Sequence, residues 1–112
     1  INLTRIDLPV CDFDSALALQ HDCIARVHAD PTSAYLILTE HDPPVITVGR
    51  HGSAAGILAS PEQLAQTRTQ VRSCKRGGQV TWHGPGQLVA YPILFWAEVG
   101  GASTLMLNFF RK

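Results

Sequence analysis

The sequence is poor in the features that mark several large classes of protein. Charged residues make up 16% of its 112 positions, against about 25% in an average globular chain. Nine basic residues balance nine acidic ones, so the chain has no net positive field to attract nucleic acid or an anionic membrane surface. No apolar run approaches the roughly 18 residues that a membrane-spanning helix needs. We therefore expect neither nucleic acid nor a membrane as a partner.

Cysteine is also scarce. Cys11, Cys23 and Cys74 form no C-x-x-C pair and have no metal-ligand spacing with the five histidines. Their odd number argues against the disulfide framework of a small secreted domain. We expect a cytoplasmic protein without a metal or cofactor, in which the cysteines are small buried apolar residues. The N-terminus has no signal-peptide core, and the absence of an initiator methionine predicts that this is not a complete translation product.

What is present is a mixture of strand and helix signals without internal repeats. An amphipathic stretch ends at Asp30-Pro31, and Ser60-Pro61 with Gln63 is typical of a helix start. The predicted elements are a strand at 2–8, a helix from Asp12 or Asp14 to 29, strands at 34–39 and 45–48, a helix at 61–69 and a strand from 71. With two further strands, this order predicts an α/β fold of the α+β type with a mixed sheet.

The segment from 76 to 89 differs from the rest of the chain. It contains a Gly-Gly pair and a Gly-Pro-Gly turn, and no charged residue occurs between 77 and 97. Such turns predict that residues 79–83 and 87–95 pair as an antiparallel hairpin. Pro92 would remove a ladder hydrogen bond, so we expect it at an edge or a bulge.

Strand alternation places Gln79, Thr81 and His83 on one face and Val80 and Trp82 on the other. A row of neutral polar side chains beside two glycine turns fits the wall of a ligand pocket. Arg76 would then lie at the mouth, where it could pair with a phosphate or carboxylate. The same pattern also fits an ordinary hairpin with a structural histidine and a surface arginine, so spacing alone leaves both interpretations open.

The string Arg-Gly-Gly-Gln-Val-Thr-Trp-His-Gly-Pro-Gly-Gln-Leu-Val at 76–89 closely resembles the signature of the octanoyltransferases of lipoate biosynthesis, the lipoate-protein ligase B family. Residues 40–50, 56–58 and 91–93 are similar to other segments of that family in order and spacing. The resemblance implies a biotin/lipoate protein ligase-like fold, related to class II synthetase catalytic domains and here truncated. Residues 1–94 would be the N-terminal part of that domain, and 95–112 a divergent tail.

The resemblance also implies a reaction. In this family an octanoyl group passes from acyl carrier protein to a lysine on a lipoyl domain, through a thioester on a cysteine whose pKa a lysine lowers. The partners would be octanoyl-acyl carrier protein and the lipoyl domains of 2-oxoacid dehydrogenases and glycine cleavage H proteins. By the same resemblance the residues that line the acyl site are Arg76, Gly77, Gly78, Gln79, Val80, Thr81, Trp82 and His83.

Departures from the family pattern qualify this expectation. The family's catalytic cysteine and lysine lie in a second half that this chain does not match, so we expect no catalytic residue here and an inactive chain. A shifted reading frame, a chimeric gene or a fragment end would each produce the tail. Two alternatives remain open: a non-catalytic remnant that binds acyl groups or lipoyl domains, and an ATP-dependent lipoate ligase. Uncovered strand edges would make the product marginally stable or oligomeric.

Overall fold

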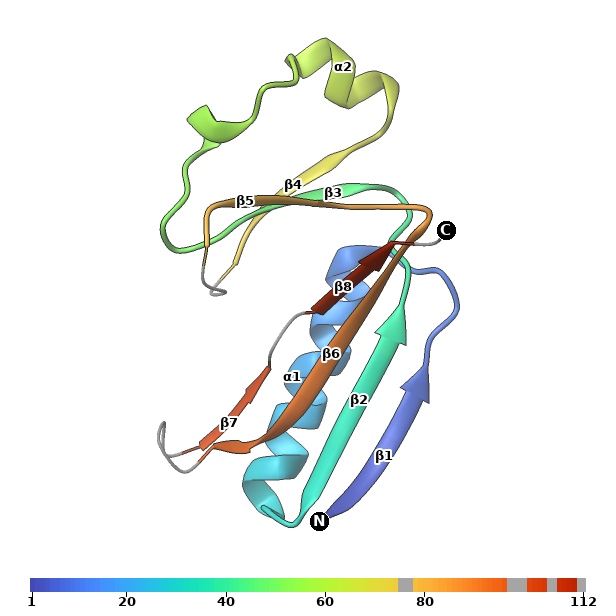
Figure 1. Ribbon diagram of the computed structural model, residues 1–112, viewed down its shortest axis with the longest axis vertical. Helices are drawn as coiled ribbons and strands as arrows, with labels where there is room; N and C mark the ends of the chain where they lie inside the picture. The colour runs from blue at the N-terminus through green and yellow to red at the C-terminus, as the bar shows by residue number, and fades with distance from the viewer. Residues whose placement is uncertain (75–77, 97–100, 105–106, 111–112) are drawn as a thin grey trace.

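The chain folds into a mixed α/β structure, shown as a ribbon in Figure 1. The computed structural model describes residues 1–74, 78–96, 101–104 and 107–110. The elements are β1 (Asn2–Asp7), α1 (Phe13–Ala29), β2 (Ser33–Thr39), β3 (Val45–Val48), the 3-10 turn η1 (Ala54–Gly56), α2 (Pro61–Gln66), β4 (Gln70–Ser73), β5 (Val80–His83), β6 (Gln87–Trp96), β7 (Gly101–Thr104) and β8 (Leu107–Phe110). The predicted fold class and the predicted order of elements are confirmed.

Local signals in the sequence set the ends of both α-helices. Asp12 caps α1 by accepting a hydrogen bond from the Ser15 amide at 3.2 Å. Ser60 and Gln63 form a capping box at the start of α2. This second helix ends at Gln66, three residues earlier than predicted, because Arg68 adopts a left-handed conformation with φ of 56°. In the described part of the chain, neither helix has the length and apolar content to cross a membrane.

The main core lies on one face of the larger sheet. The strand order of this sheet is β1-β2-β6, and both β7 and β8 pair with β6 on the side away from β2. In Figure 1, α1 lies along this sheet and covers one face. The core side chains come from α1, β2 and β6: Cys23, Val27, Ile37, Val89, Tyr91 and Ile93. Burial is therefore confirmed for Cys23, whereas Cys11 and Cys74 are only half-buried.

The environment of Pro92 agrees with the prediction on one side of the strand only. Pro92 lies inside β6 and pairs with Leu36 of β2. On the opposite side the described ladder with β8 ends at Ala90 and the ladder with β7 begins at Ile93, so Pro92 falls between them. The antiparallel register with β2 passes from Tyr35↔Ile93 through Leu36↔Pro92 to Thr39↔Val89 without a bulge. An antiparallel ladder alternates between pairs that exchange hydrogen bonds and pairs that do not, so it can accommodate a proline facing one neighbour.

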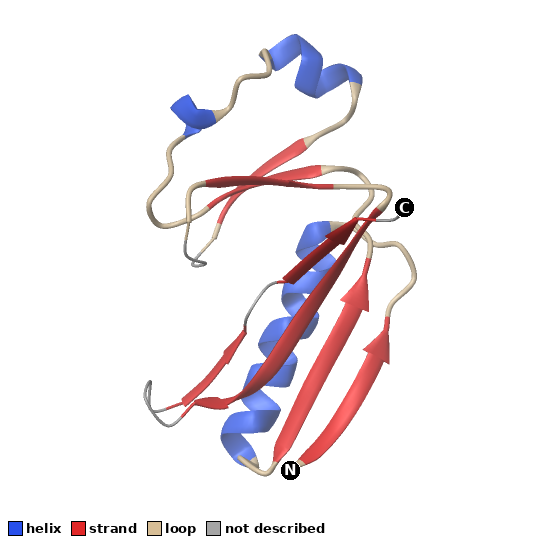
Figure 2. Cartoon of the chain, in the orientation of Figure 1, coloured by secondary structure: helices blue, strands red, loops and turns tan. Residues whose placement is uncertain are grey.

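The predicted hairpin between residues 79–83 and 87–95 is wrong. β5 pairs antiparallel with β3, and β3 pairs parallel with β4, which makes a separate sheet of order β4-β3-β5. Figure 2 shows that β5, which precedes the turn, and β6, which follows it, run in different directions. The turn itself forms, with the Gln87 amide donating to the Gly84 carbonyl at 3.0 Å. It carries the chain from one sheet to the other because each strand finds its ladder partners elsewhere.

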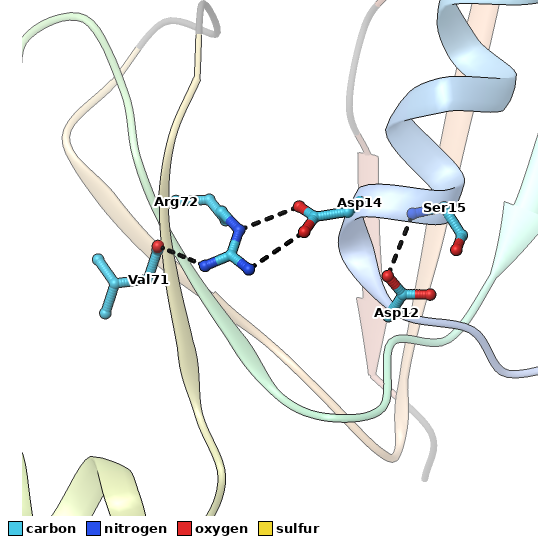
Figure 3. A network of polar contacts seen from close by, with 5 residues as sticks. All are labelled: Asp12, Asp14, Ser15, Val71 and Arg72. Carbon is cyan, nitrogen blue, oxygen red and sulfur yellow. Dashed lines mark hydrogen bonds and ion pairs between the residues drawn. The ribbon is translucent and has the colours of Figure 1, made fainter.

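A bidentate ion pair joins the smaller sheet to the start of α1 (Figure 3). Arg72 of β4 places Nε 3.0 Å and Nη2 3.1 Å from the two carboxylate oxygens of Asp14. The third guanidinium nitrogen, Nη1, donates to the Val71 carbonyl at 3.0 Å. Both charged side chains are solvent-accessible, so the pair contributes at most about 1 kcal/mol. It links β4 of the smaller sheet to the first turn of α1.

Candidate functional site

Strand β5 carries most of the described residues of the predicted acyl site. Its register against β3 places Val80 opposite Val48, Thr81 opposite Thr47 and His83 opposite Val45. A methyl group on Gly56 would lie 3.0 Å from Cγ2 of Val80, and one on Gly84 would lie 2.3 Å from the Trp82 ring. Val80 and Trp82 therefore pack against glycine positions in the flanking loops.

The predicted site residues differ widely in exposure. His83 is completely buried, whereas Trp82 is 43% exposed. Val80 and Thr81 are half-buried, and Gly78 and Gln79 are exposed. Arg76 and Gly77 lie outside the described residues. Accessible surface is thus concentrated between 78 and 82, and His83 marks the inner end of the strand.

The loop after β3 holds the backbone of residues 78 and 79 from the side. The amides of Gly49 and His51 donate to the carbonyls of Gln79 and Gly78, at 2.6 and 3.2 Å. A Cβ atom on Gly52 would lie only 2.7 Å from the Gln79 carbonyl oxygen. Gly78 has φ of 87°, as the sequence led us to expect of a glycine corner. The two backbones therefore touch directly and leave no space for a side chain at position 52.

Behind β5, a buried polar group surrounds His83. Its Nδ1 is hydrogen-bonded to Oε1 of Gln87, and its Nε2 lies 3.5 Å from Oγ1 of Thr47. The Gln87 amide nitrogen donates to the Trp82 carbonyl at 3.0 Å. The Gly86 amide donates to a carboxylate oxygen of Glu40 at 3.3 Å. Side chains from three strand ends thus hold the turn between the sheets.

His41 extends this polar group to the large sheet and α1. Its Nδ1 donates to the Cys11 carbonyl at 3.2 Å, which leaves Nε2 to accept from the Tyr91 hydroxyl at 2.8 Å. The ring also contacts Phe13 and His83, with centroid separations of 5.6 and 6.2 Å. Burial lowers the pKa of His41 and raises that of Tyr91, so both are neutral at neutral pH. Sequence reasoning named no partner for His41, because its partners lie 30 and 50 positions away.

The buried neutral state of His41 predicts a loss of stability in mild acid. In the unfolded chain its pKa returns to the ordinary 6.5, above the folded value. As the pH falls below about 6.5, the unfolded state binds the proton first, so the free energy of unfolding decreases until the folded pKa is passed. Urea unfolding of the chain and of His41→Gln at a series of pH values measures this. An equal acid dependence in both proteins would show that another group is responsible.

The other candidate chemistry in the described residues is limited. No three side chains of His, Cys, Asp or Glu gather there closely enough to hold a metal ion. Burial raises the pKa of the Cys23 thiol, which keeps it protonated and a poor nucleophile. The half-buried Cys11 places Sγ 3.5 Å from Oγ1 of Thr39. The described residues therefore offer a partly accessible strand, β5, with a buried polar support behind it.

Comparison with known proteins connects this strand to an enzyme family. The profile of the lipoyl protein ligase A/B catalytic domain matches residues 12–104. An octanoyltransferase of Geotalea uraniireducens is 44% identical over 95 residues, which cover 85% of this chain and 41% of the relative. An octanoyltransferase of Caldicellulosiruptor bescii is 59% identical over 82 residues, which cover 73% of this chain and 36% of the relative. The chain thus spans about two fifths of the length of such relatives.

Solved structures show the same fold at low sequence identity. The crystal structure of Plasmodium falciparum LipL1 in complex with lipoate superimposes with a TM-score of 0.61 and 11% identity. The superposition covers 81% of this chain and 31% of LipL1. The lipoate-ligase-like architecture expected from the sequence is therefore confirmed for the part of the domain that this chain contains.

Proposed function

Since the chain belongs to the lipoyl protein ligase A/B catalytic domain family, we propose that it is part of an octanoyltransferase and supplies the acyl-binding strand of that enzyme. Family membership confirms the resemblance found in residues 76–89. The activity of the whole enzyme would be transfer of an octanoyl group from acyl carrier protein to a lipoyl-domain lysine, in the cytoplasm. The acceptors would be lipoyl domains of 2-oxoacid dehydrogenases and glycine cleavage H proteins.

The observation that carries this proposal is the construction of residues 78–83. The backbone of Gly78 and Gln79 lies at the surface, where amides of the loop at 49–52 hold its carbonyls. Val80, Thr81 and Trp82 follow with accessible side chains, none of them charged. An octanoyl thioester is a neutral apolar chain with one polar end, so a neutral strand with a buried polar support suits it. On this proposal Arg76 and Gly77 belong to the same site.

The reaction itself needs groups that we do not assign in this chain. The cysteine thiol gives up its proton, the resulting thiolate attacks the acyl carrier thioester, and the carrier thiolate that leaves takes up a proton as the new thioester forms. The neutral acceptor lysine amine then attacks this thioester, the amide forms, and the proton lost from the amine passes to the leaving cysteine thiolate and regenerates the thiol. We assign the cysteine and its pKa-lowering lysine to the part of the relatives that this chain does not span. The role proposed for residues 76–83 is to hold the acyl group during both steps.

The proposal predicts binding without turnover. The chain should bind the thioester S-octanoyl-N-acetylcysteamine, with NMR amide shifts concentrated between Gly78 and His83, and the acetyl analogue should bind much more weakly. It should not transfer octanoate from acyl carrier protein to a lipoyl domain. Shifts elsewhere, or none, would refute the acyl site. Turnover that Cys74→Ser abolishes would refute the placement of the nucleophile outside this chain.

Two further measurements separate this proposal from its alternatives. Pull-down of a lipoyl domain by the chain, without binding of the octanoyl thioester, would favour a remnant that recognises the acceptor protein. Binding of ATP would favour a lipoate ligase, which activates its acid with a nucleotide. The two curated octanoyltransferase relatives support the transferase over the ligase.

A further inference from the structure

The orientation of the Gln87 side-chain amide is determined by its hydrogen-bond partners. It is the first residue of β6 and is 1% exposed. One end of its amide faces the Trp82 carbonyl at 3.0 Å, and the other end faces Nδ1 of His83. A carbonyl oxygen only accepts hydrogen bonds, so the amide nitrogen must face Trp82. The reversed amide would place two acceptor oxygens against each other, and that arrangement is excluded.

This orientation determines which nitrogen of His83 carries the proton. The Gln87 oxygen accepts only, so Nδ1 of His83 must donate to it. A neutral imidazole has a single N–H group, and Nε2 therefore carries the lone pair. Nε2 lies on the side of Thr47, 3.5 Å from its hydroxyl. Thr47 is the register partner of Thr81 on β5.

We propose that Gln87 is a positioning residue, which holds His83 as the neutral Nδ1–H tautomer. In this tautomer Nε2 is a hydrogen-bond acceptor, and it faces Thr47 of β3, the register partner of Thr81 on β5. The functional half of this inference rests on the proposed function, in which β5 holds the acyl group. Gln87 itself touches no ligand and acts through His83. Its two hydrogen bonds also tie Trp82 and His83, the last two residues before the Gly84 turn, to the first residue after that turn.

NMR of the histidine ring nitrogens in the full chain tests the assignment, at a pH well above the ordinary histidine pKa of about 6.5. Wild-type His83 should show the Nδ1–H tautomer. Gln87→Met keeps the side-chain length but removes both the acceptor for His83 and the donor to Trp82, so it should lose that tautomer and bind S-octanoyl-N-acetylcysteamine about fivefold more weakly. Gln87→Glu keeps an acceptor for Nδ1 and should keep the tautomer, while its second oxygen, which faces the Trp82 carbonyl, should lower the stability.

Gln20→Met is the matched control. Gln20 is also buried, at 5% exposure, but it lies on α1, whereas the described side-chain hydrogen bonds of His83 are with Gln87 and Thr47. This control should leave the His83 tautomer and probe affinity unchanged. If Gln87→Met does not fold, Gln87→Glu decides on its own: an Nε2–H tautomer in that variant, which keeps the acceptor for Nδ1, overturns the role of Gln87.

The possible results separate the inference from the function on which it rests. An Nε2–H tautomer in the wild type, or no change in Gln87→Met, overturns the role of Gln87. A tautomer that changes as expected while probe affinity stays constant overturns the positioning role in binding. If the wild type shows the Nδ1–H tautomer but binds no probe, the acyl site is wrong and Gln87 still sets the state of His83.

Discussion

Replacing Gly52 with alanine is expected to weaken binding of S-octanoyl-N-acetylcysteamine by tenfold or more, which is about 1.4 kcal/mol. The new Cβ would lie 2.7 Å from the carbonyl oxygen and 2.8 Å from the carbonyl carbon of Gln79. Those atoms belong to backbone that cannot rotate away, so residues 78 and 79 must shift. Because we place the acyl group against these residues, the shift displaces the binding surface. A titration followed by NMR measures the affinity.

Gly56→Ala is the control for this substitution. An alanine Cβ at position 56 would have Cγ2 of Val80 as its nearest atom, at 3.0 Å, and beyond the adjoining residues no backbone atom would lie within 4 Å. A side-chain methyl can move by a few tenths of an ångström, so the affinity should change by no more than about threefold, or less than 1 kcal/mol. If Gly52→Ala folds and binds as tightly as the wild type, the acyl group does not contact residues 78 and 79.

Removing the His41 side chain is expected to lower the free energy of unfolding by about 3–5 kcal/mol. The substitution His41→Ala leaves a cavity beside Phe13 and removes the acceptor of the Tyr91 hydroxyl and one donor to the Cys11 carbonyl. The buried Tyr91 hydroxyl loses that hydrogen bond in a dry interior, whereas the Cys11 carbonyl keeps its bond from the Asp42 amide. Small domains are stable by only about 5–15 kcal/mol, so this loss is a large fraction of the total. Urea unfolding followed by circular dichroism measures it.

Two companion variants identify the origin of that loss. Tyr91→Phe removes only the hydroxyl and should cost about 1–3 kcal/mol, because it leaves the His41 Nε2 atom without its donor. His21→Ala changes an exposed histidine on α1 and should change the stability by at most about 0.5 kcal/mol. Equal effects of His41→Ala and His21→Ala would show that the buried polar group contributes little to folding.

The local elements could be predicted because their signals are local. Asp12 and Ser60 cap their helices through hydrogen bonds to residues three positions away, and those partners are visible in the sequence. The run at 45–48 is apolar and β-branched, and it forms the strand β3 as expected. Such signals do not depend on where the rest of the chain lies, so they can be recognised without knowledge of the fold.

The strand pairing around the Gly-Pro-Gly turn could not be predicted in the same way. The turn is a good hairpin signal, yet β5 pairs with β3, more than thirty residues earlier, and β6 pairs with β2. A turn determines only that the chain reverses locally, whereas the choice of ladder partner depends on which strands are available in space. Sequence reasoning did not name Gln87 as the partner of His83, although only four positions separate them. A hairpin closed by residues 84–86 would also have placed the two opposite each other, so this contact does not depend on the hairpin being right or wrong.

From the sequence alone came the α/β class, the order of the strands and helices through β6, the glycine corner at Gly78, and the family signature in residues 76–89. All of these depend on periodicity, capping or a contiguous motif, which a linear chain displays directly. Only the tertiary structure decided that β5 and β6 belong to different sheets and that His41, Tyr91, His83 and Gln87 form one buried polar group. That decision depends on contacts between distant residues, whose energies arise only when the sheets and the helix pack and exclude water.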